Sequence, residues 1–589
     1  MFLVTTSDER TWKTDEKILF LGEWCKLYKR KDKWSRLDYR VAPYHWDDRG
    51  RLYKDYNYLE GIYENYLRLL SDKLNIIHGC NHSARYWRII IGPWLRFFIE
   101  VLYDRYLSIA AARDSGEIHT TFLLQVDPWN WVPDNVGQFY ANSEHDSWNG
   151  FIYSEIIKFL DVIPYQKIAE KNLPSQPLPA KKKSFILGFL FGVLRFYSKL
   201  LPDSLKKVVF FDSGFGELNT VRLSIKLKQV PYWFPDIKAD SVEVDKPLRK
   251  QLQLSVASSE FESLLESLLP LQIPKIYLEG FVKIRDKVLQ ILPKQPTIII
   301  TANGYNSNDI FKIWAAEKTE KDTKLVIVQH GGTFGMALWV QSEDHQIDVA
   351  DKFFIWGRPN REEKNLKQMS AGKIIRAKKN IHSNSNGPMY MVLAELPTTS
   401  YWMYSIPVAS QFLKYIDDQF KFIQHLNAPA IKTLKVRLFP HDYGWSMKQR
   451  FIDKGLDHII DTSGDSFVKA LNKHKLCIST YNSTTYLETL AADYPTILFW
   501  NQKHFELRPK AQPYFDALIK VGILHETPQS AAKLINKIYK DPQKWWRQPD
   551  IQAVKNEFCA AFVKADKDWK NEWATELKKM CASESINNL

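Results

Sequence analysis

The sequence predicts an α/β protein that contains two parallel β-sheet domains. Short apolar runs that end in small polar loops recur along residues 208–328 and again along residues 390–500, with helical segments between them. Since parallel strands need crossover connections, usually helices, this alternation indicates parallel sheets whose loops gather at one edge. The length of 589 residues agrees with this, because one hydrophobic core seldom organises so long a chain.

The first sheet is expected from three apolar runs, each followed by a loop that contains glycine. The runs are 208–211 before DSGFG, 297–301 before ANGY, and 325–328 before QHGGT. Four further runs predict the second sheet: 390–393, 434–439, 476–478 and 496–500. Loops that follow parallel strands lie at the sheet edge where ligands bind, so a site is expected among them.

Two weakly patterned segments divide the chain. Residues 173–180 are rich in proline and indicate a loop, whereas residues 375–388 are basic, rich in Ser and Asn, and indicate a linker. The sequence therefore predicts four parts: an aromatic-rich, mainly helical region at 1–180, sheet domains at 181–385 and 386–530, and C-terminal helices at 531–589 that pack back across the domains. Helices are expected at 53–75, 86–112, 145–161, 531–539 and 550–579.

The chain is basic, with 81 Lys and Arg against 67 Asp and Glu and a net charge of +14. Such a surplus favours anionic partners, among them phosphorylated metabolites and acidic lipid. The sequence has no long Lys/Arg-rich tail, no RNP-like motif and no zinc-finger spacing. We therefore expect no nucleic-acid partner.

The cysteines and the N-terminus favour a cytoplasmic location. The five cysteines are scattered and form no CxxC pair, and MFLVTTSDERTW lacks the pattern of a signal peptide. Residues 185–201 are the most apolar segment, but the uninterrupted part ends at Arg195, short of the roughly 20 residues that span a bilayer. Such a basic, apolar helix suits either burial in the protein or peripheral contact with an acidic membrane surface.

Residues 476–500, LCISTYNSTTYLETLAADYPTILFW, predict a strand, a hydroxyl-rich turn, a helix and a second strand. Ser483, Thr484 and Thr485 stand where the helix begins. There the hydroxyls, the free backbone N–H groups and the positive end of the helix dipole suit an anion such as phosphate. Glu488 fits a capping box or a ribose contact, and an ordinary capped helix is the alternative for the whole turn.

Two histidine loops are expected near this turn. His441, in PHDYG, follows the run 434–438 and would face the same cleft, where a nucleotide phosphate could bind; a loop with a capping Asp is the alternative. His330, in QHGGT, lies at the end of a strand of the first domain and suits proton transfer or phosphate contact, with a structural histidine as the alternative. Asp212, which opens DSGFG, is a further candidate base.

These motifs resemble those of one family. QHGGTFG, PHDYG and STYNSTTYLETLAADYPTILFWN look like segments of a family of transferases encoded in bacterial O-antigen and surface-carbohydrate gene clusters. LGEWCKLYKRKDKWSRLDYRVAPYHWDDR and HGCNHSARYWRIIIGPWL look like that family too, so the resemblance spans nearly the whole chain.

A looser similarity runs to GT-B enzymes that use CMP-activated acidic sugars, including sialyl- and Kdo-transferases, and to CDP-glycerol-dependent polymerases. It implies a pair of Rossmann-like domains. It also implies that His441, Ser483, Thr484 and Thr485 bind the donor phosphate, with Glu488 near the ribose. The chain has Pro440 before the histidine, where sialyltransferases have proline after it, and it lacks an acidic-acidic-Gly base motif.

The acceptor is expected on the first domain and the N-terminal region. Candidate acceptor-binding residues are His45, Asp47, Asp48, Arg85 and Arg88. The arginines could hold a phosphorylated or carboxylated acceptor, and the first three are also candidate bases. The Asp pair suits a surface turn better than a metal site, and HGCNHS offers no second pair of zinc ligands, so neither a metal nor a cofactor is expected.

The resulting hypothesis is a metal-independent GT-B glycosyltransferase. It would move a sugar from a nucleotide-activated donor, with a CMP-linked acidic sugar favoured, onto a glycan or lipid-linked glycan such as O-antigen. His330 and Asp212 would act at the reacting bond. The alternatives are a CDP-polyol phosphotransferase and a non-catalytic protein that binds nucleotide or glycan.

Overall fold

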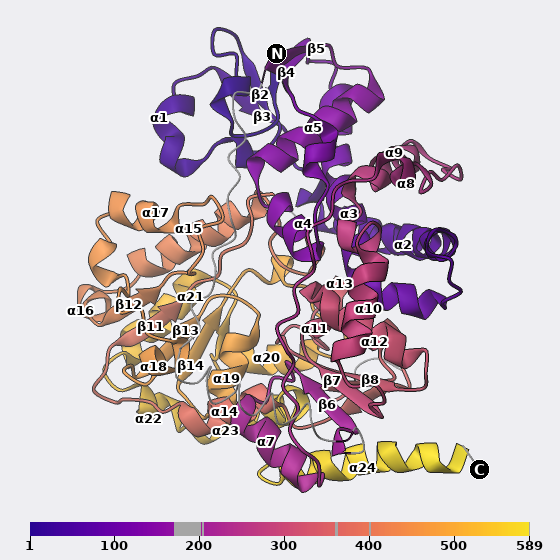
Figure 1. The fold of residues 1–589 in the computed structure, drawn as a ribbon. Helices are drawn as coiled ribbons and strands as arrows, with labels where there is room; N and C mark the ends of the chain where they lie inside the picture. Colours follow the sequence, from indigo (N-terminus) through magenta and orange to yellow (C-terminus); the bar gives the residue numbers. More distant parts are fainter. Residues whose placement is uncertain (170–201, 203–204, 360–362, 400–401, 588–589) are drawn as a thin grey trace.

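The computed structural model describes residues 1–169, 202, 205–359, 363–399 and 402–587. The apolar segment 185–201 lies outside these residues. The described strands form three five-stranded sheets whose pairings are all parallel. In Figure 1 the N-terminal region lies at the top, the first α/β domain at the lower right and the second at the lower left. The predicted α/β class and the pair of Rossmann-like parallel-sheet domains are confirmed.

The N-terminal region is rich in helix, as expected, but it also contains a sheet that the sequence analysis did not predict. Its strands run in the order β3-β2-β1-β4-β5 and are β1 (Phe2–Val4), β2 (Ile18–Phe20), β3 (Tyr39–Val41), β4 (Thr120–Gln125) and β5 (Tyr165–Ala169). Its helices are α1 (Lys31–Trp34), α2 (Arg49–His78), α3 (Ala84–Asp114), α4 (Val136–Ser143) and α5 (Asp146–Leu160). The first three strands have only three residues each, too few for a readable alternation.

The long helices α2 and α3 begin and end at recognisable signals. The Asp48 carboxylate accepts the N–H groups of Gly50 and Arg51 at the start of α2, and Gly79, with a φ of 61°, ends it. The Ser83 hydroxyl caps α3 in the same way. These caps set where α2 and α3 begin and where α2 ends.

The sheet of the first α/β domain has the order β10-β9-β8-β7-β6. Its strands are β6 (Val208–Phe211), β7 (Ile298–Thr301), β8 (Lys324–Val328), β9 (Lys352–Ile355) and β10 (Leu366–Gln368). Its helices are α7 (Glu217–Lys226), α8 (Lys246–Lys250), α9 (Glu260–Gln272), α10 (Phe281–Ile291), α11 (Gly304–Ser307), α12 (Asp309–Thr319) and α13 (Gln341–Val349). One sheet face shares a core with α12, α13 and α3.

The sheet of the second α/β domain has the order β12-β11-β13-β14-β15. Its strands are β11 (Met389–Val392), β12 (Leu434–Arg437), β13 (Leu476–Ser479), β14 (Thr496–Phe499) and β15 (Leu524–His525). Because β12 and β13 lie on opposite sides of β11, the chain reverses direction across the sheet between β11 and β13. The crevice at the carboxyl ends of those two strands is the usual ligand site of such a sheet.

The helices of this domain and of the C-terminal segment follow the expected pattern with two differences. They are α14 (Gly372–Asn380), α15 (Gln411–Gln424), α16 (Ala428–Lys432), α17 (Met447–Asp453), α18 (Phe467–Leu471), α19 (Thr484–Ala491), α20 (Gln512–Lys520), α21 (Pro528–Ile538), α22 (Pro542–Trp546), α23 (Pro549–Phe562) and α24 (Trp569–Asn587). The segment 375–388 was expected to be a linker, but α14 occupies its first part. The expected helix 550–579 is two helices, α23 and α24.

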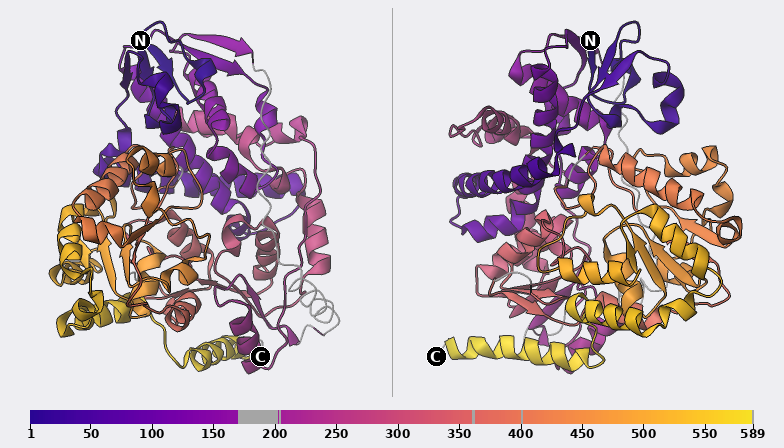
Figure 2. Two further views of the ribbon diagram at one scale, coloured as in Figure 1. Left: turned by 90° about the vertical axis from the view of Figure 1, so that its left-hand side faces the viewer. Right: turned by 180° about the vertical axis from the view of Figure 1, so that it is seen from behind.

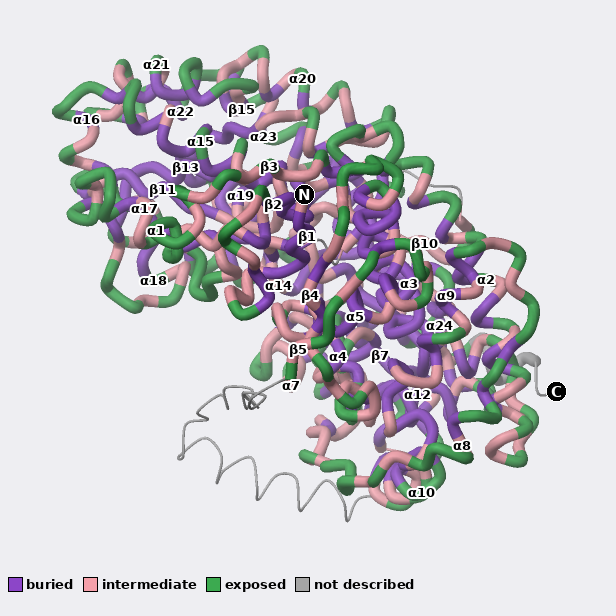
Figure 3. The backbone as a smooth tube through the Cα atoms, turned by 90° about the horizontal axis from the view of Figure 1, so that it is seen from above, coloured by how far each residue is buried: buried purple, intermediate pink, exposed green. Residues whose placement is uncertain are grey.

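The break between α23 and α24 lets the chain cross from the second domain to the first. Lys564 donates its backbone N–H to Trp356 and accepts that of Ala371, at 2.9 Å each, so extended backbone bonds replace the helix there. Trp573 of α24 then packs with Val208 and Phe354 on the remaining face of the first sheet. Figure 2 shows α24 at the end of the molecule farthest from the N-terminus, and Figure 3 shows how buried the strands are.

Candidate functional site

The predicted hydroxyl turn joins β13 to α19. Ser483 occupies the N-cap position of α19, yet its hydroxyl makes no capping hydrogen bond. The Thr485 hydroxyl instead meets the hydroxyl of Tyr481 at 2.8 Å. Because no side chain caps the first turn of α19, its N–H groups and the helix dipole remain available to an anion.

The QHGG loop of the first domain touches this turn directly. The Gly332 N–H donates to Thr484 Oγ1 at 3.0 Å. A Cβ atom on Gly332 would lie 2.7 Å from the Ser483 carbonyl and the Thr484 nitrogen, so only glycine allows this approach. The carboxyl ends of β8 and β13, from different sheets, therefore meet at the start of α19.

His330 lies in this loop, after β8 and beside the end of β7. Its Nδ1 atom is buried and makes no hydrogen bond of standard geometry with a described residue. Burial, assisted by the nearby Lys373 cation, lowers the pKa of His330 to about 4. The imidazole is therefore neutral at pH 7 and can accept a hydrogen bond or a proton.

Asp212 opens the loop after β6, one strand away from the end of β7. The residue is exposed and holds a φ of 45°, and its carbonyl accepts the Ala302 N–H at 2.9 Å. The backbone of Ala302 lies near the His330 ring and opposes the fall in its pKa. The ends of β6, β7 and β8 thus place Asp212, Ala302 and His330 in one row.

Two cations on α14 complete the site, and the sequence analysis missed both. Lys373 Nζ lies 3.6 Å from Glu488 Oε1. Arg376, one turn further along α14, lies against Gly216, where a Cβ atom would be 2.8 Å from Arg376 Nη1. Arg376 falls in the segment 375–388 that was assigned to a linker, and Lys373 lies just before it. The spacing of the buried residues Ile374, Ala377 and Ile381 is the helical signal that could have revealed α14.

Glu488 lies on α19, where it pairs with Lys373 instead of forming a capping box. Burial raises the pKa of its carboxyl group, and the Lys373 cation opposes that rise. The pair links α14 to α19 just after the hydroxyl turn.

His441 follows β12, two strands away from β13 along the same sheet edge. Its side chain is 62% exposed, and its Nε2 atom is 4.0 Å from Glu144 of the N-terminal region. Asp442 does not orient the imidazole, because its carboxylate accepts the N–H groups of Gly444 and Ser446 and pairs with Lys29 at 3.1 Å. Among the described residues no hydrogen bond or ion pair joins His441 to the turn at Ser483.

Glu395, in the loop after β11, is a buried carboxyl group that the sequence analysis did not single out. Its Oε1 accepts the Tyr443 N–H at 2.8 Å. Burial raises the pKa of Glu395 to about 8, and the neighbouring Asp442 carboxylate adds to the rise while Lys29 opposes it. No local signal marks such a residue, since its neighbours come from distant segments.

The expected acceptor residues from YHWDDR take structural positions. His45 is buried, with Nε2 at 3.3 Å from Asp104 on α3. Asp48 caps α2, and Asp47 accepts the Ser410 hydroxyl at 3.2 Å. Acceptor binding by these residues stays a prediction.

Arg85 and Arg88 bind the protein itself. Arg85 donates to the Val349 carbonyl at 2.8 Å and pairs with Asp351 at 2.7 Å. Arg88 pairs with Glu64 of α2 and lies 3.5 Å from Asp348. Both guanidinium groups thereby attach α3 to α2 or to the first α/β domain.

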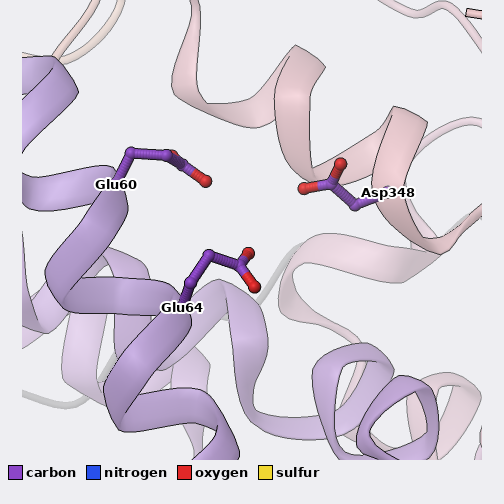
Figure 4. Close-up of side chains that lie close together, drawn as sticks. All are labelled: Glu60, Glu64 and Asp348. Atoms are coloured by element: carbon purple, nitrogen blue, oxygen red, sulfur yellow. The ribbon is translucent and has the colours of Figure 1, made fainter.

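Glu60, Glu64 and Asp348 converge in one acidic cluster, shown in Figure 4. Arg88 pairs with Glu64, and the buried Arg96 pairs with Glu60 at 2.5 and 2.7 Å. Two arginines therefore offset most of the charge of the three carboxylates, and the geometry suits a network that holds α2, α3 and α13 together.

The HGCNHS turn is also committed to packing. His78 bonds to the Tyr277 carbonyl at 3.1 Å, and His82 stacks on Tyr86 with ring centroids 3.7 Å apart. Cys80 lies near Asn75. Across the residues that the structure describes, no helix has the length and apolarity to cross a membrane.

Comparisons with known proteins place the chain in a family. A search of curated proteins found no match. Among solved structures, a variant of the wall teichoic acid polymerase TagF soaked with CDPG for 30 minutes is similar at 10% identity, 68% coverage of this chain, 99% of that chain and a TM-score of 0.33. A second TagF structure, from a 15 minute soak, is similar at 11% identity, 51% coverage of this chain, 84% of that chain and a TM-score of 0.30.

Such loose overlaps assign no role to any residue of this chain. The family model is different, because it matches residues 1–577. The chain belongs to the LIC12162 family of transferases.

Proposed function

We propose that this transferase is a GT-B-type glycosyltransferase that moves a sugar from a nucleotide-activated donor onto a surface glycan such as O-antigen. One observation carries the proposal: the Gly332 contact brings the His330 loop to the uncapped start of α19. A histidine, hydroxyls, free N–H groups and Lys373 then surround one point between two parallel sheets. A CMP-linked acidic sugar is the donor we favour, because the basic surroundings suit an additional negative charge.

The donor phosphate would bind the first turn of α19, together with Ser483, Thr485 and Lys373. These donors are fixed before the reaction, which is what stabilises a departing phosphate most effectively. We propose that Lys373, and not a metal ion, neutralises the leaving group. Glu488 would position Lys373 through their ion pair and is a candidate ribose contact.

In the proposed reaction an acceptor hydroxyl oxygen forms a bond to the anomeric carbon of the donor sugar. The bond from that carbon to the phosphate oxygen breaks, and the nucleotide leaves with the electron pair. The acceptor proton passes to a base. We assign that base to Asp212, and we assign to the neutral His330 a hydrogen bond that orients the acceptor hydroxyl or the phosphate.

The donor site is tested by adding CMP, CDP, UDP or GDP and measuring the change in melting temperature. One nucleotide should stabilise the protein, by about 2.7 kcal/mol when present at 100 times its Kd. Ser483→Ala and Lys373→Ala should each weaken that effect about tenfold or more in Kd, while Lys379→Ala, on the same helix, should not. If none of the four nucleotides stabilises the unaltered protein, the donor site is wrong.

Catalysis needs a separate measurement, since a binding protein would also pass the first test. Release of the nucleotide from its sugar conjugate should depend on Asp212, so Asp212→Asn should lose activity while keeping the nucleotide-induced stabilisation. His441→Ala measures whether the exposed histidine belongs to the site at all. Stabilisation by nucleotide with no turnover on any acceptor would favour the non-catalytic alternative.

A further inference from the structure

A cavity of about 370 Å³ opens beside the loop that follows β6. Its lining includes two carboxylates, a hydroxyl, three aromatic rings and a guanidinium group: Asp212, Glu217, Thr220, Tyr232, Trp233, Phe234 and Arg376. Ligand sites typically measure about 300–1,000 Å³ and combine an apolar wall with a few polar groups. The cavity therefore has the size and composition of a small-molecule site.

The aromatic wall is held in place from behind. Phe234 meets Phe211 edge-on at 4.5 Å between ring centroids and Trp314 at 5.2 Å. Tyr232 is buried against the same core. A wall braced in this way presents its rings in a fixed orientation, so a ligand ring can stack on it without first ordering the protein.

Arg376 reaches the cavity from α14, which precedes the second domain. Its guanidinium group occupies the space that the missing side chain of Gly216 leaves. Within the described part of the chain Arg376 acts on the Glu488 carboxylate electrostatically but makes no hydrogen bond or ion pair, although Arg85, Arg88 and Arg96 of α3 all do. A guanidinium without a carboxylate partner is suited to a bidentate anion from outside the protein.

The three features together define a chemical class. A sugar ring presents C–H groups that pack on an aromatic face and hydroxyls that donate to a carboxylate such as Asp212. The unpaired Arg376 adds a requirement for a carboxylate or a phosphate on that sugar. A neutral sugar would leave the guanidinium unused.

We propose that this cavity binds the acceptor of the transfer, and that the acceptor is an anionic sugar whose charged group pairs with Arg376. The assignment rests on the proposed function for its orientation. Lys373 and Arg376 are one helical turn apart on α14, so this helix would hold the donor phosphate with one residue and the acceptor charge with the next. Asp212 would face the acceptor hydroxyl.

Binding of single sugars to the full-length protein tests the proposal. Isothermal titration at millimolar concentrations should detect glucuronate or glucose 6-phosphate, with glucose and inorganic phosphate at least tenfold weaker. Whichever charged sugar binds shows whether the anion is a carboxylate or a phosphate. Equal binding of glucose, or no binding of either charged sugar, would overturn the assignment.

Variants locate the site and keep the two proposals separate. Arg376→Gln removes a charge-assisted hydrogen bond, so we expect binding of the charged sugar to fall about 10- to 100-fold. Arg222→Gln removes the same charge from the exposed side of α7 and should have no effect. Trp233→Leu should weaken the charged and the neutral sugar alike.

All three variants should keep the stabilisation by nucleotide, which shows that they fold and that the donor site is intact. Unchanged sugar binding in Arg376→Gln would contradict the acceptor assignment and leave the donor site standing. If no nucleotide binds the unaltered protein, the donor site is wrong, while binding of the charged sugar at Arg376 can still be measured.

Discussion

The α3 arginines, Arg85 and Arg88, and the α14 cations, Lys373 and Arg376, have the same spacing but different surroundings. Arg85 and Arg88 each meet a carboxylate of the chain within 3 Å. Lys373 is 3.6 Å from Glu488, and Arg376 makes no ion pair with a described residue. Two cations one helical turn apart therefore do not by themselves indicate an anion site. Whether the fold supplies the opposite charge decides their role.

The two pairs of cations also differ in where they lie. The α3 arginines lie between α3 and its neighbours, where each pairs with a carboxylate of the chain. The α14 cations lie at the edge of two sheets, where loops of Gly and hydroxyl residues leave them open. The first set holds the fold together, and the second is available to a ligand.

The largest effect on stability should come from removing Arg96, the most buried residue of the network that it and Arg88 form with Glu60, Glu64 and Asp348. Arg96→Ala leaves the Glu60 carboxylate without its partner, and we expect a loss of about 3–5 kcal/mol in the free energy of unfolding. Urea denaturation measures it. Arg85→Ala, at a side chain that is 36% exposed, should lose less than about 1 kcal/mol. Equal losses in the two variants would contradict the distinction between buried and exposed pairs.

A smaller effect should follow from Gly332→Ala, which pushes the QHGG loop away from the start of α19, near the α14 cations. The new methyl group cannot avoid the backbone of Ser483 and Thr484, so the loops must separate, at a cost of about 1–3 kcal/mol. We also expect the rate of the proposed sugar transfer to fall by up to about 100-fold, because the groups assigned to the reaction are displaced.

The neighbouring glycine provides the matched control. A Cβ atom on Gly331 has its nearest neighbour at 3.8 Å, which is ordinary contact. Gly331→Ala should therefore keep both stability and activity. If both alanine variants behave alike, the contact between the two loops is not what assembles the site.

The last effect depends on pH and concerns the buried carboxyl group of Glu395. With its pKa raised from the ordinary 4.5 to about 8, folded Glu395 keeps a proton that the unfolded chain releases. Stability from this group is thus present below about pH 4.5 and is lost as the pH rises towards 8, at no more than about 1.4 kcal/mol per pH unit. Glu395→Gln should flatten the fall in melting temperature between pH 5 and pH 8. An unchanged slope would mean that Glu395 is ionised in the folded protein.

The sequence predicted those elements whose signal is local. Residues 476–500 show it best: an apolar run, small hydroxyl residues and helical spacing follow one another, and β13, α19 and β14 lie where expected. The strands β6, β7 and β8 and the helices α2, α3 and α5 were predicted within a few residues for the same reason. Each has enough residues to show its own period.

Pairings between distant segments could not be predicted. Arg85 is separated from Asp351 by 266 residues, so nothing near Arg85 in the sequence shows that its charge is already used. The Phe2–Val4 strand is too short to be recognised without β4, its partner more than a hundred residues away. Arg376 was missed because the basic, Ser/Asn-rich composition of 375–388 outweighed a helical period of only two turns, and Lys373 because it lies just before that segment.

Because α24 is synthesised last, one face of the first α/β sheet stays uncovered until the end of translation. Phe215, in the loop that borders the cavity, stacks on Trp569 and meets Trp573 edge-on, and both belong to α24. On a ribosome, β6 to β10 would emerge some two hundred residues before the helix that covers one of their faces. Until then the strands must present Val208, Ile300 and Val326 to water or to a chaperone. The nascent chain is therefore most prone to aggregate late in translation, when most of the protein is already made.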